Sequence, residues 1–140
     1  MNQNVQQLVD GLNVDLAHEY GAAIQYTYSA AVVTGIHRAA LKDFFTEEIN
    51  DEMGHALYLS EKISALGGVP TTEAASVEQP AETTELLKAI RKAEEDTIER
   101  YETRRKQAED LGYTDLVVKL EDMIADETKH KEEVAKLLDN

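Results

Sequence analysis

The chain has 140 residues, which is enough for one domain with its own hydrophobic core. Its net charge of -14 opposes non-specific binding to nucleic acid and to anionic membranes. Because it contains no cysteine, disulfides, iron–sulfur clusters and thiolate zinc sites are excluded, and any metal must be held by oxygen and nitrogen. The polar amino terminus and the lack of a long apolar run predict a cytoplasmic protein without a membrane partner, folded as one domain over residues 1–140.

Apolar residues recur at helical spacing along almost the whole chain, which predicts four long helices. The first is expected at roughly residues 4–36, with a break near Gly35. Its inward stripe consists of Val5, Leu8, Leu12, Leu16, Glu19, Ala23, Tyr26, Ala30 and Val33. The second is expected at roughly residues 39–66 and ends on Gly67 and Gly68, a pair typical of a left-handed helix cap. Its stripe consists of Leu41, Phe44 or Phe45, Glu48, Glu52, His55, Leu59, Ile63 and Leu66.

The third helix follows a turn-rich stretch that ends at Pro80, and Thr83 or Thr84 is its candidate N-cap. Its stripe consists of Leu87, Ile90, Glu94, Thr97 or Ile98, Tyr101, Arg105 and Ala108. The fourth helix, at roughly residues 114–138, has the stripe Leu116, Leu120, Met123, Glu127, His130, Val134 and Leu137. Two short links and one long connection predict an all-α, antiparallel four-helix bundle with a crossover between the second and third helices, the connectivity of ferritin-like bundles.

Other charged residues are expected at the surface. A basic cluster lies among glutamates in the third helix, which predicts a solvated helix face; its members are Arg100, Arg104, Arg105 and Lys106. His18 and His37 lie off the inward stripes, so we expect surface or loop positions for both.

Four residues of the first half recur in the second half in the same order, each displaced by 75 positions. The pairs are Glu19 and Glu94, Tyr26 and Tyr101, Glu52 and Glu127, and His55 and His130. A Glu-x-x-His step places a carboxylate and an imidazole on one helix face, one turn apart. One inward Glu from each of two helices and a Glu-x-x-His pair from each of the other two form the ligand set of a di-iron carboxylate site. The repeat therefore predicts a centre for two metal ions.

The alternative interpretation is a buried polar network in which Glu–His hydrogen bonds only fix the packing. It is disfavoured because four carboxylates in one core repel each other and lose hydration, at a cost of several kcal/mol each, unless they are neutralised. Two divalent cations neutralise four carboxylates. Carboxylate and imidazole ligands suit iron, with manganese or a mixed pair as the alternative, whereas structural zinc sites usually contain thiolates.

We expect Glu52 and Glu127 to bridge the two ions. The remaining ligands are Glu19 and His55 for one ion, and Glu94 and His130 for the other. Two Fe(II) ions held in this way can each give one electron to O2 or H2O2. Tyr26 and Tyr101 lie about two turns beyond an inward Glu. One interpretation is that their hydroxyls bond a ligand carboxylate or act as local electron donors; the favoured one is that they are aromatic core residues with satisfied hydroxyls.

Several segments resemble bacterioferritins. Residues 19–26 (EYGAAIQY) are similar to their first-helix motif, residues 48–56 (EINDEMGHA) and 66–70 (LGGVP) to their second, and residues 126–130 (DETKH) to their fourth. The resemblance implies a ferroxidase centre with the six ligands named above. Met53 is similar in position to the methionine that ligates haem across the bacterioferritin dimer interface. For this outward-facing methionine, an apolar interface without haem is the favoured interpretation.

The chain also departs from the bacterioferritin pattern. It ends shortly after the fourth expected helix, without the short fifth helix of that family, so its closed storage shell is not implied. The interval from Gly112 to Glu127 is similar to that of rubrerythrins. However, the extra third-helix glutamate of rubrerythrins is replaced here by Thr97 or Arg91, and their cysteine-ligated iron domain is impossible without cysteine.

We therefore expect a homo-oligomer, at least a dimer, in which each chain binds two irons and oxidises Fe(II) with O2 or H2O2 for iron storage or detoxification. One alternative is a rubrerythrin-like peroxidase without a rubredoxin domain. Another is a non-catalytic metal-binding bundle. No nucleic-acid partner is expected, because the chain is strongly acidic.

Overall fold

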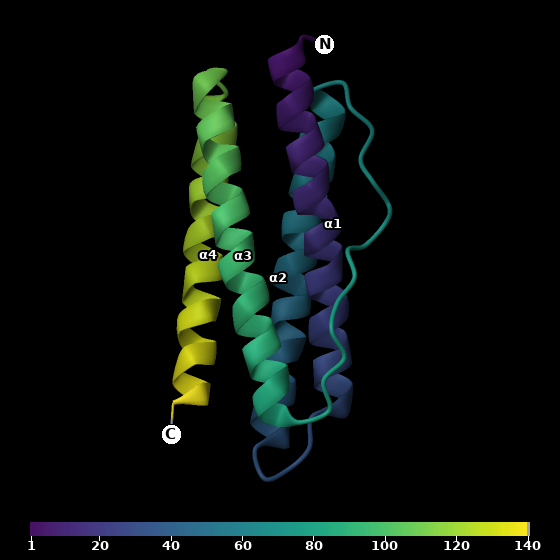
Figure 1. Cartoon of the computed structure of the whole chain (residues 1–140), viewed down its shortest axis with the longest axis vertical. Helices are drawn as coiled ribbons and strands as arrows, with labels where there is room; N and C mark the ends of the chain where they lie inside the picture. Colours follow the sequence, from purple (N-terminus) through teal and green to yellow (C-terminus); the bar gives the residue numbers. More distant parts are fainter. Residues whose placement is uncertain (140) are drawn as a thin grey trace.

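A computed structural model of the chain describes residues 1–139 and contains four long helices (Figure 1). They are α1 (Gln3–Val32), α2 (Arg38–Ala65), α3 (Thr83–Asp110) and α4 (Thr114–Leu138). Helices α1 and α2 form one antiparallel hairpin, α3 and α4 form another, and residues 66–82 cross from one end of the bundle to the other. This confirms the all-α bundle with one long crossover. The single-domain expectation extends to Asn140, which lies outside the described residues.

The ends of α1 and α2 lie within one residue of the sequence prediction, except that α1 ends at Val32, four residues before the expected residue 36. The break expected near Gly35 occurs there, with φ of +101°, a conformation that side chains with a Cβ rarely adopt. Gly67 likewise has φ of +92° after α2. The N–H of Gly68 then donates to the carbonyl of Ile63 over 2.9 Å, which satisfies a terminal carbonyl of the helix.

The expected threonine cap of α3 is wrong. Glu82 is the N-cap residue and makes no side-chain cap hydrogen bond. Thr83 is already the first helical residue, and its hydroxyl donates to the carbonyl of Thr34 over 3.3 Å. The hydroxyl thus ties the start of α3 to the loop between α1 and α2, a tertiary contact that a local cap rule does not anticipate.

Two hydrophobic clusters fill the bundle, one on each side of a layer of buried carboxylates and imidazoles. The first includes Leu12, Leu16, Leu59, Tyr101 and Leu120, and the second includes Tyr26, Phe45, Leu87, Ile90 and Val134. Nearly all residues of the expected stripes are buried. Leu137 is an exception, since it is 44% exposed while its neighbour Leu138 packs against the second cluster. The apolar layers thereby fix the height of the polar layer between them.

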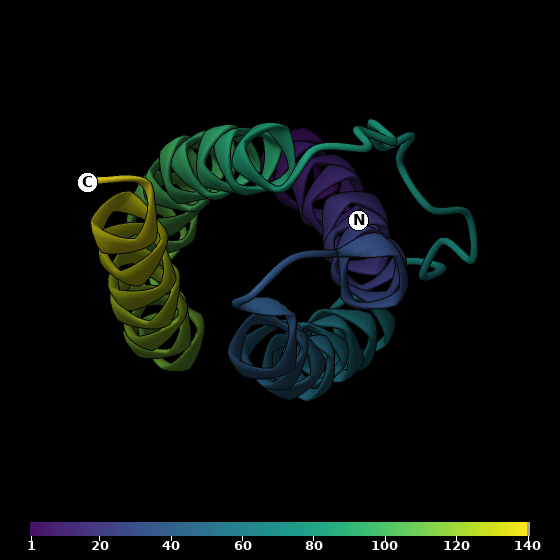
Figure 2. The same cartoon turned by 90° about the horizontal axis from the view of Figure 1, so that it is seen from below.

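The helices do not all pack equally. Helix α1 packs mainly on α2, and α3 packs mainly on α4, while contacts between α1 and α3 join the two hairpins. Helices α2 and α4 lie farther apart, as the view along the bundle shows (Figure 2). The two Glu-x-x-His helices therefore face each other across the polar layer without packing backbone to backbone. No helix within residues 1–139 is long and apolar enough to cross a membrane.

The basic cluster of α3 is not a uniformly solvated face, contrary to the prediction. Arg104 is only 7% exposed, and its Nε and Nη2 donate to the Asp15 carboxylate over 2.7 Å and 3.2 Å. Gly11 leaves the room for this guanidinium, because a Cβ there would overlap Arg104 Nη1. Arg105, expected on the inward stripe, is partly exposed instead. The buried face of α3 thus shifts by one residue at this turn, because Arg104 pairs with the buried Asp15 of α1.

The crossover is held along α1. The side chain of Asn13 donates to the carbonyl of Val69 over 3.1 Å and accepts from the N–H of Thr71 over 2.8 Å. Further along, the N–H of Ala75 donates to the carbonyl of Ala17 over 2.8 Å. These bonds place the middle of the crossover beside the part of α1 that carries Glu19.

Candidate metal centre

The six predicted ligands meet in the polar layer, and all four helices contribute to it. Helix α1 supplies Glu19 and α3 supplies Glu94, whereas α2 and α4 each supply a Glu-x-x-His pair. All six residues are between 1% and 6% exposed. Each lies near the middle of its helix, far from the fraying ends, so their backbone positions are rigid.

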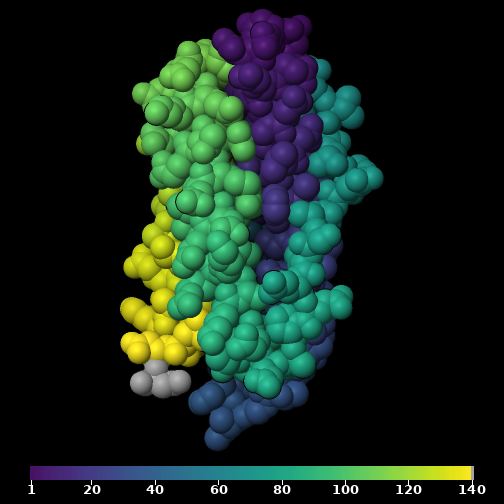
Figure 3. All heavy atoms as spheres, viewed as in Figure 1, coloured from purple at the N-terminus to yellow at the C-terminus, as the bar shows by residue number. Residues whose placement is uncertain are grey.

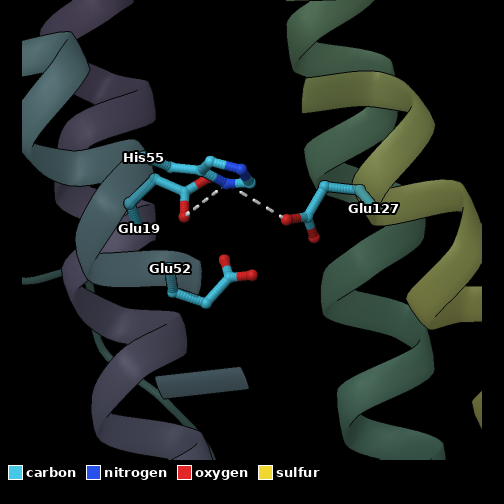
Figure 4. A group of neighbouring side chains, drawn as sticks. All are labelled: Glu19, Glu52, His55 and Glu127. Atoms are coloured by element: carbon cyan, nitrogen blue, oxygen red, sulfur yellow. Dashed lines mark ion pairs between the residues drawn. The ribbon is translucent and has the colours of Figure 1, made fainter. Parts of the chain in front are cut away.

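Four of the ligands form one compact group (Figure 4). Glu19, Glu52, His55 and Glu127 each offer an oxygen or nitrogen, and these atoms all lie within 4.8 Å of one another. His55 Nδ1 lies 3.4 Å from Glu127 Oε1 and 3.7 Å from Glu19 Oε2. Four atoms at such spacing around one point can bind a common cation.

A second group is formed by Glu94, Glu127 and His130, again within 4.8 Å of one another. His130 Nδ1 lies 3.6 Å from Glu94 Oε2 and 3.7 Å from Glu52 Oε1. Glu127 belongs to both groups, and Glu52 reaches the histidine of the second group as well as the members of the first. The two glutamates therefore occupy the shared positions between two adjacent cation sites.

One atom in each of the six residues is buried and has no hydrogen-bond partner within the described chain. These atoms are Glu19 Oε2, Glu52 Oε1, His55 Nδ1, Glu94 Oε2, Glu127 Oε1 and His130 Nδ1. Buried polar atoms are almost always paired, because leaving one unpaired costs about 1–3 kcal/mol or more. Six such atoms that face the same space fit a pair of cations, and a purely structural polar network would have paired them.

The raised pKa values of three residues in the polar layer indicate an excess of negative charge there. Burial and the charge of Glu127 raise the pKa of Glu94 to about 10. Burial and the charges of Glu19 and Glu127 raise the pKa of Glu52 well above its usual value. Burial opposes protonation of His55, but the negative charges of the nearby Glu127 and Glu19 carboxylates outweigh it and raise the pKa of His55 to about 10. In the absence of metal, protons thus take the place of cations.

Both histidines are oriented from behind by aspartates. His55 Nε2 lies 3.2 Å from Asp126 Oδ2, and His130 Nε2 lies 3.6 Å from Asp51 Oδ2. A carboxylate behind a ligating imidazole fixes its tautomer, so that Nδ1 faces the centre. Sequence reasoning did not assign these aspartates, although the signal was present, because Asp51 and Asp126 are also separated by 75 positions.

One carboxylate breaks the twofold pattern. Glu48 is 6% exposed, and its Oε2 lies 2.5 Å from His130 Nε2. The residue 75 positions later is Met123, which belongs to the first hydrophobic cluster. His130 therefore has two carboxylates behind it, whereas His55 has one. The two halves of the centre are not electrostatically equivalent.

Each of the two tyrosines donates a hydrogen bond to a carboxylate of the other helical hairpin. Tyr26 on α1 donates its hydroxyl to Glu94 on α3, and Tyr101 on α3 donates to Glu19 on α1. Both phenols are buried, with exposures of 3% and 0%. Each therefore holds one ligand carboxylate by its second oxygen and leaves the other oxygen facing the centre. An electron-donor role for either tyrosine stays a prediction.

The remaining candidates lie away from the polar layer. Met53 is 46% exposed on the outer side of α2, as expected, beside an open cavity of about 380 Å³ lined by Tyr20, Ile24 and Ile49. Its assignment as a haem ligand stays a prediction. His37 is exposed, as predicted, whereas His18 is half-buried and lines a cavity between α1 and α3.

Comparisons with known proteins agree with this architecture. The ferritin-like domain family matches residues 9–140. A crystal structure of a ferritin-like, diiron-carboxylate protein from Bacillus anthracis is 55% identical, with a TM-score of 0.98 over 99% of this chain and 100% of that one. A dodecameric thioferritin, the bacterioferritin-related protein of Bacteroides fragilis, is 27% identical, with a TM-score of 0.87 over 96% of this chain and 85% of that one.

A nutrient stress-induced DNA-binding protein from Nostoc sp. is 36% identical over 77 residues, which cover 55% of this chain. The match spans only 40% of that protein, so this chain corresponds to less than half of its length. The family match is far longer than this local similarity, and it includes all six residues of the polar layer. The chain therefore belongs to the ferritin-like domain family.

Proposed function

We propose that this protein is a ferroxidase that binds two Fe(II) ions per chain and oxidises them with O2 or H2O2. The observation that carries the proposal is the set of six buried, unpaired ligand atoms that face one space. Oxygen and imidazole nitrogen are ligands that iron accepts readily. The absence of thiolates distinguishes this centre from a typical structural zinc site.

In the proposed arrangement, Glu52 and Glu127 would be the ligands shared by the two irons. The terminal ligands are Glu19 and His55 on one side, and Glu94 and His130 on the other. The shared position of Glu127 in both groups of ligand atoms supports this division. The oxidation of two Fe(II) supplies two electrons, which together with two protons either reduce O2 to H2O2 or break the O–O bond of H2O2 to give two molecules of water.

The protein contributes geometry and proton control to this reaction. Tyr26 and Tyr101 hold one oxygen each of Glu94 and Glu19, so that these carboxylates need little reorganisation when iron binds. The raised pKa values of Glu94 and His55 mean that binding of iron displaces protons from the layer.

The same proposal includes assembly and physiological role. Because the Bacteroides relative is described as dodecameric, we propose that this chain also forms a homo-oligomer, and that its iron chemistry serves storage or protection. The Nostoc relative is described as DNA-binding. The net charge of -14 opposes direct contact with a phosphate backbone, so nucleic acid is not part of the proposal.

Anaerobic loading with Fe(II), followed by metal analysis, tests the proposal. We expect about two irons per chain, rapid oxidation on addition of O2 or H2O2, and loss of both in Glu52→Ala and Glu127→Ala. Glu95→Ala is the matched control, because Glu95 neighbours a ligand but is exposed. Fewer than two irons, or unchanged binding in the two ligand variants, would contradict the assignment. Binding of two irons without oxidation would support a non-catalytic metal-binding bundle instead.

A further inference from the structure

A cavity of about 220 Å³ extends from the surface between α1 and α3 to the polar layer. Ser76 and Glu78 of the crossover lie at its outer side. Its inner end is lined by the carboxylates of Glu52, Glu94 and Glu127. The space-filling view shows this face, with a hollow about midway along the bundle where α1, α3 and the crossover meet (Figure 3). The candidate centre is therefore connected to the outside on this side.

The cavity lies on the pseudo-twofold axis of the centre. Its α1 and α3 walls include four pairs of residues that are each separated by 75 positions, as the ligands are. The pairs are His18 and Ala93, Gly21 and Asp96, Ala22 and Thr97, and Gln25 and Arg100. A molecule that arrives along this axis meets both halves of the centre together. Such an approach suits a reactant that must take one electron from each of two ions.

Small side chains keep the cavity open. Gly21, Ala22 and Ala93 line it where α1 faces α3. A Cβ on Gly21 would lie 2.9 Å from the carbonyl oxygen of Ala75, so any larger residue there would push the crossover away. The backbone bond from Ala75 to Ala17 holds the crossover at this height. A volume of this size has room for several water-sized molecules.

The charges around the cavity do not favour a cation. Arg100 lines it, and its Nη2 donates to Thr97 Oγ1 over 2.8 Å, while its buried Nε makes no hydrogen bond within the described chain and lies 3.7 Å from Asp15 Oδ1. Lys92 at the outer end is paired with Asp96 over 2.8 Å. Apart from the three carboxylates at its inner end, the cavity is lined by two acidic residues, Glu78 and Asp96, and two basic ones, Lys92 and Arg100. In a chain with a net charge of -14, this part of the cavity is thus balanced in charge. Fe(II) gains no electrostatic advantage from entering here.

The opposite face of the bundle carries the negative charge that attracts a cation. Between α2 and α4, the exposed carboxylates of Asp51 and Asp126 lie behind the two histidines, with Glu48 beside them. No lysine or arginine forms an ion pair with these three residues within the described chain. Divalent cations are therefore attracted to the α2–α4 side, and the α1–α3 side is left for uncharged reactants.

We propose that the cavity between α1 and α3 is the route by which a small uncharged O–O oxidant, O2 or H2O2, reaches the centre, separately from Fe(II). The side-chain amide of Gln25, which lines the cavity, offers hydrogen bonds to such a molecule along the way. This inference rests on the proposed ferroxidase function and assigns its oxidant to one side of the bundle.

Substitutions that fill the cavity test access of the oxidant without changing the residues proposed to bind iron. In Ala22→Leu, the added side chain occupies the axis without altering a ligand, and Ala31→Leu is the matched control on an exposed turn of α1. Ser76→Phe closes the outer end from the exposed crossover, and it provides a second test if Ala22→Leu does not fold. Folding is checked by thermal unfolding before any kinetic comparison.

Each protein is first loaded anaerobically with Fe(II), so that the rate and stoichiometry of loading are measured alone, and is then mixed with O2 or with H2O2. We expect unchanged loading and a roughly tenfold slower oxidation in the filled variants. Slowing with one oxidant only would assign the route to that oxidant. Equal oxidation rates in the wild type and both filled variants, or a matching loss in the rate of Fe(II) loading, would overturn the inference. If the wild type itself binds no Fe(II), the proposed function fails instead.

Discussion

At the scale of single residues, the distinguishing feature of the centre is that buried polar atoms of its side chains lack hydrogen-bond partners. Six buried atoms face one space without hydrogen bonds, and the pKa values around them show that protons compensate part of the negative charge. This arrangement is poor for a metal-free core and good for a pair of cations. The crossed tyrosines and the rear aspartates complete it by fixing which atom of each ligand faces inward.

Binding of metal at neutral pH should release at least two protons per chain, one from His55, one from Glu94 and any held by Glu52, whose pKa is also raised. His55 and Glu94 both have pKa values of about 10 without metal, so both are protonated at pH 7, and a bound cation requires their deprotonated forms. Calorimetric titration with Co(II) in buffers of different ionisation enthalpy measures this number. An identical binding enthalpy in all buffers would show that no proton is released.

Glu48 should make the two halves of the centre bind metal unequally. Its carboxylate stands behind His130, where the other half has Met123, and an added acceptor raises the basicity of a ligating imidazole. We expect Glu48→Met to weaken the tighter of two binding steps by about tenfold and to bring the steps closer together. Co(II) absorption titrations give both constants. The exposed neighbour Glu47 supplies the control, Glu47→Met, which should leave both steps unchanged.

At the scale of the helices, most of the architecture was readable from periodicity. The fourth helix has the predicted bounds, and the glycine ends of the first two helices are confirmed. The structure brings the six candidate ligand residues together, as the repeat and the stripes predicted from local spacing, while their binding of metal stays a prediction. The burial of Arg104 was not readable, since its partner Asp15 lies 89 positions away and its space depends on Gly11 of another helix. The cavity could not be predicted from the sequence for the same reason, because it forms only where α1, α3 and the crossover come together in the folded chain.

The Asp15–Arg104 pair should matter most when it is broken on one side. Arg104→Met removes both hydrogen bonds to the buried Asp15 carboxylate and leaves it only Arg100 Nε, 3.7 Å away, so we expect a loss of about 3–5 kcal/mol in the free energy of unfolding. The positions that correspond by the 75-residue repeat are Ile90 and Ser29, so Asp15→Ile with Arg104→Ser copies the other end of the bundle. Urea unfolding should show the double variant to be less destabilised than Arg104→Met. A double variant that is as unstable as the single one would show that the charges themselves are required.

At the scale of the whole molecule, the polar layer makes stability depend on pH in opposite directions with and without metal. Without metal, His55 contributes stability that is fully present below its unfolded pKa of 6.5 and is lost as the pH rises through about 10. Glu94 acts in the same direction, because its pKa rises from 4.5 to about 10, so that ionisation of the folded protein becomes more costly across that range.

The metal-free protein should therefore melt at a lower temperature at pH 9.5 than at pH 7. The metal-loaded protein should melt at a higher temperature than the metal-free one at neutral pH, and this difference should disappear as the pH falls. Bound cations replace the protons of the layer, so lowering the pH to about 4.5 protonates Glu and His ligands and releases metal. Thermal unfolding of both forms between pH 4.5 and 9.5, with Co(II) as the loaded metal, measures the two slopes. Parallel slopes would mean that protons and metal do not compete for the same atoms, and would remove the polar layer as the metal centre.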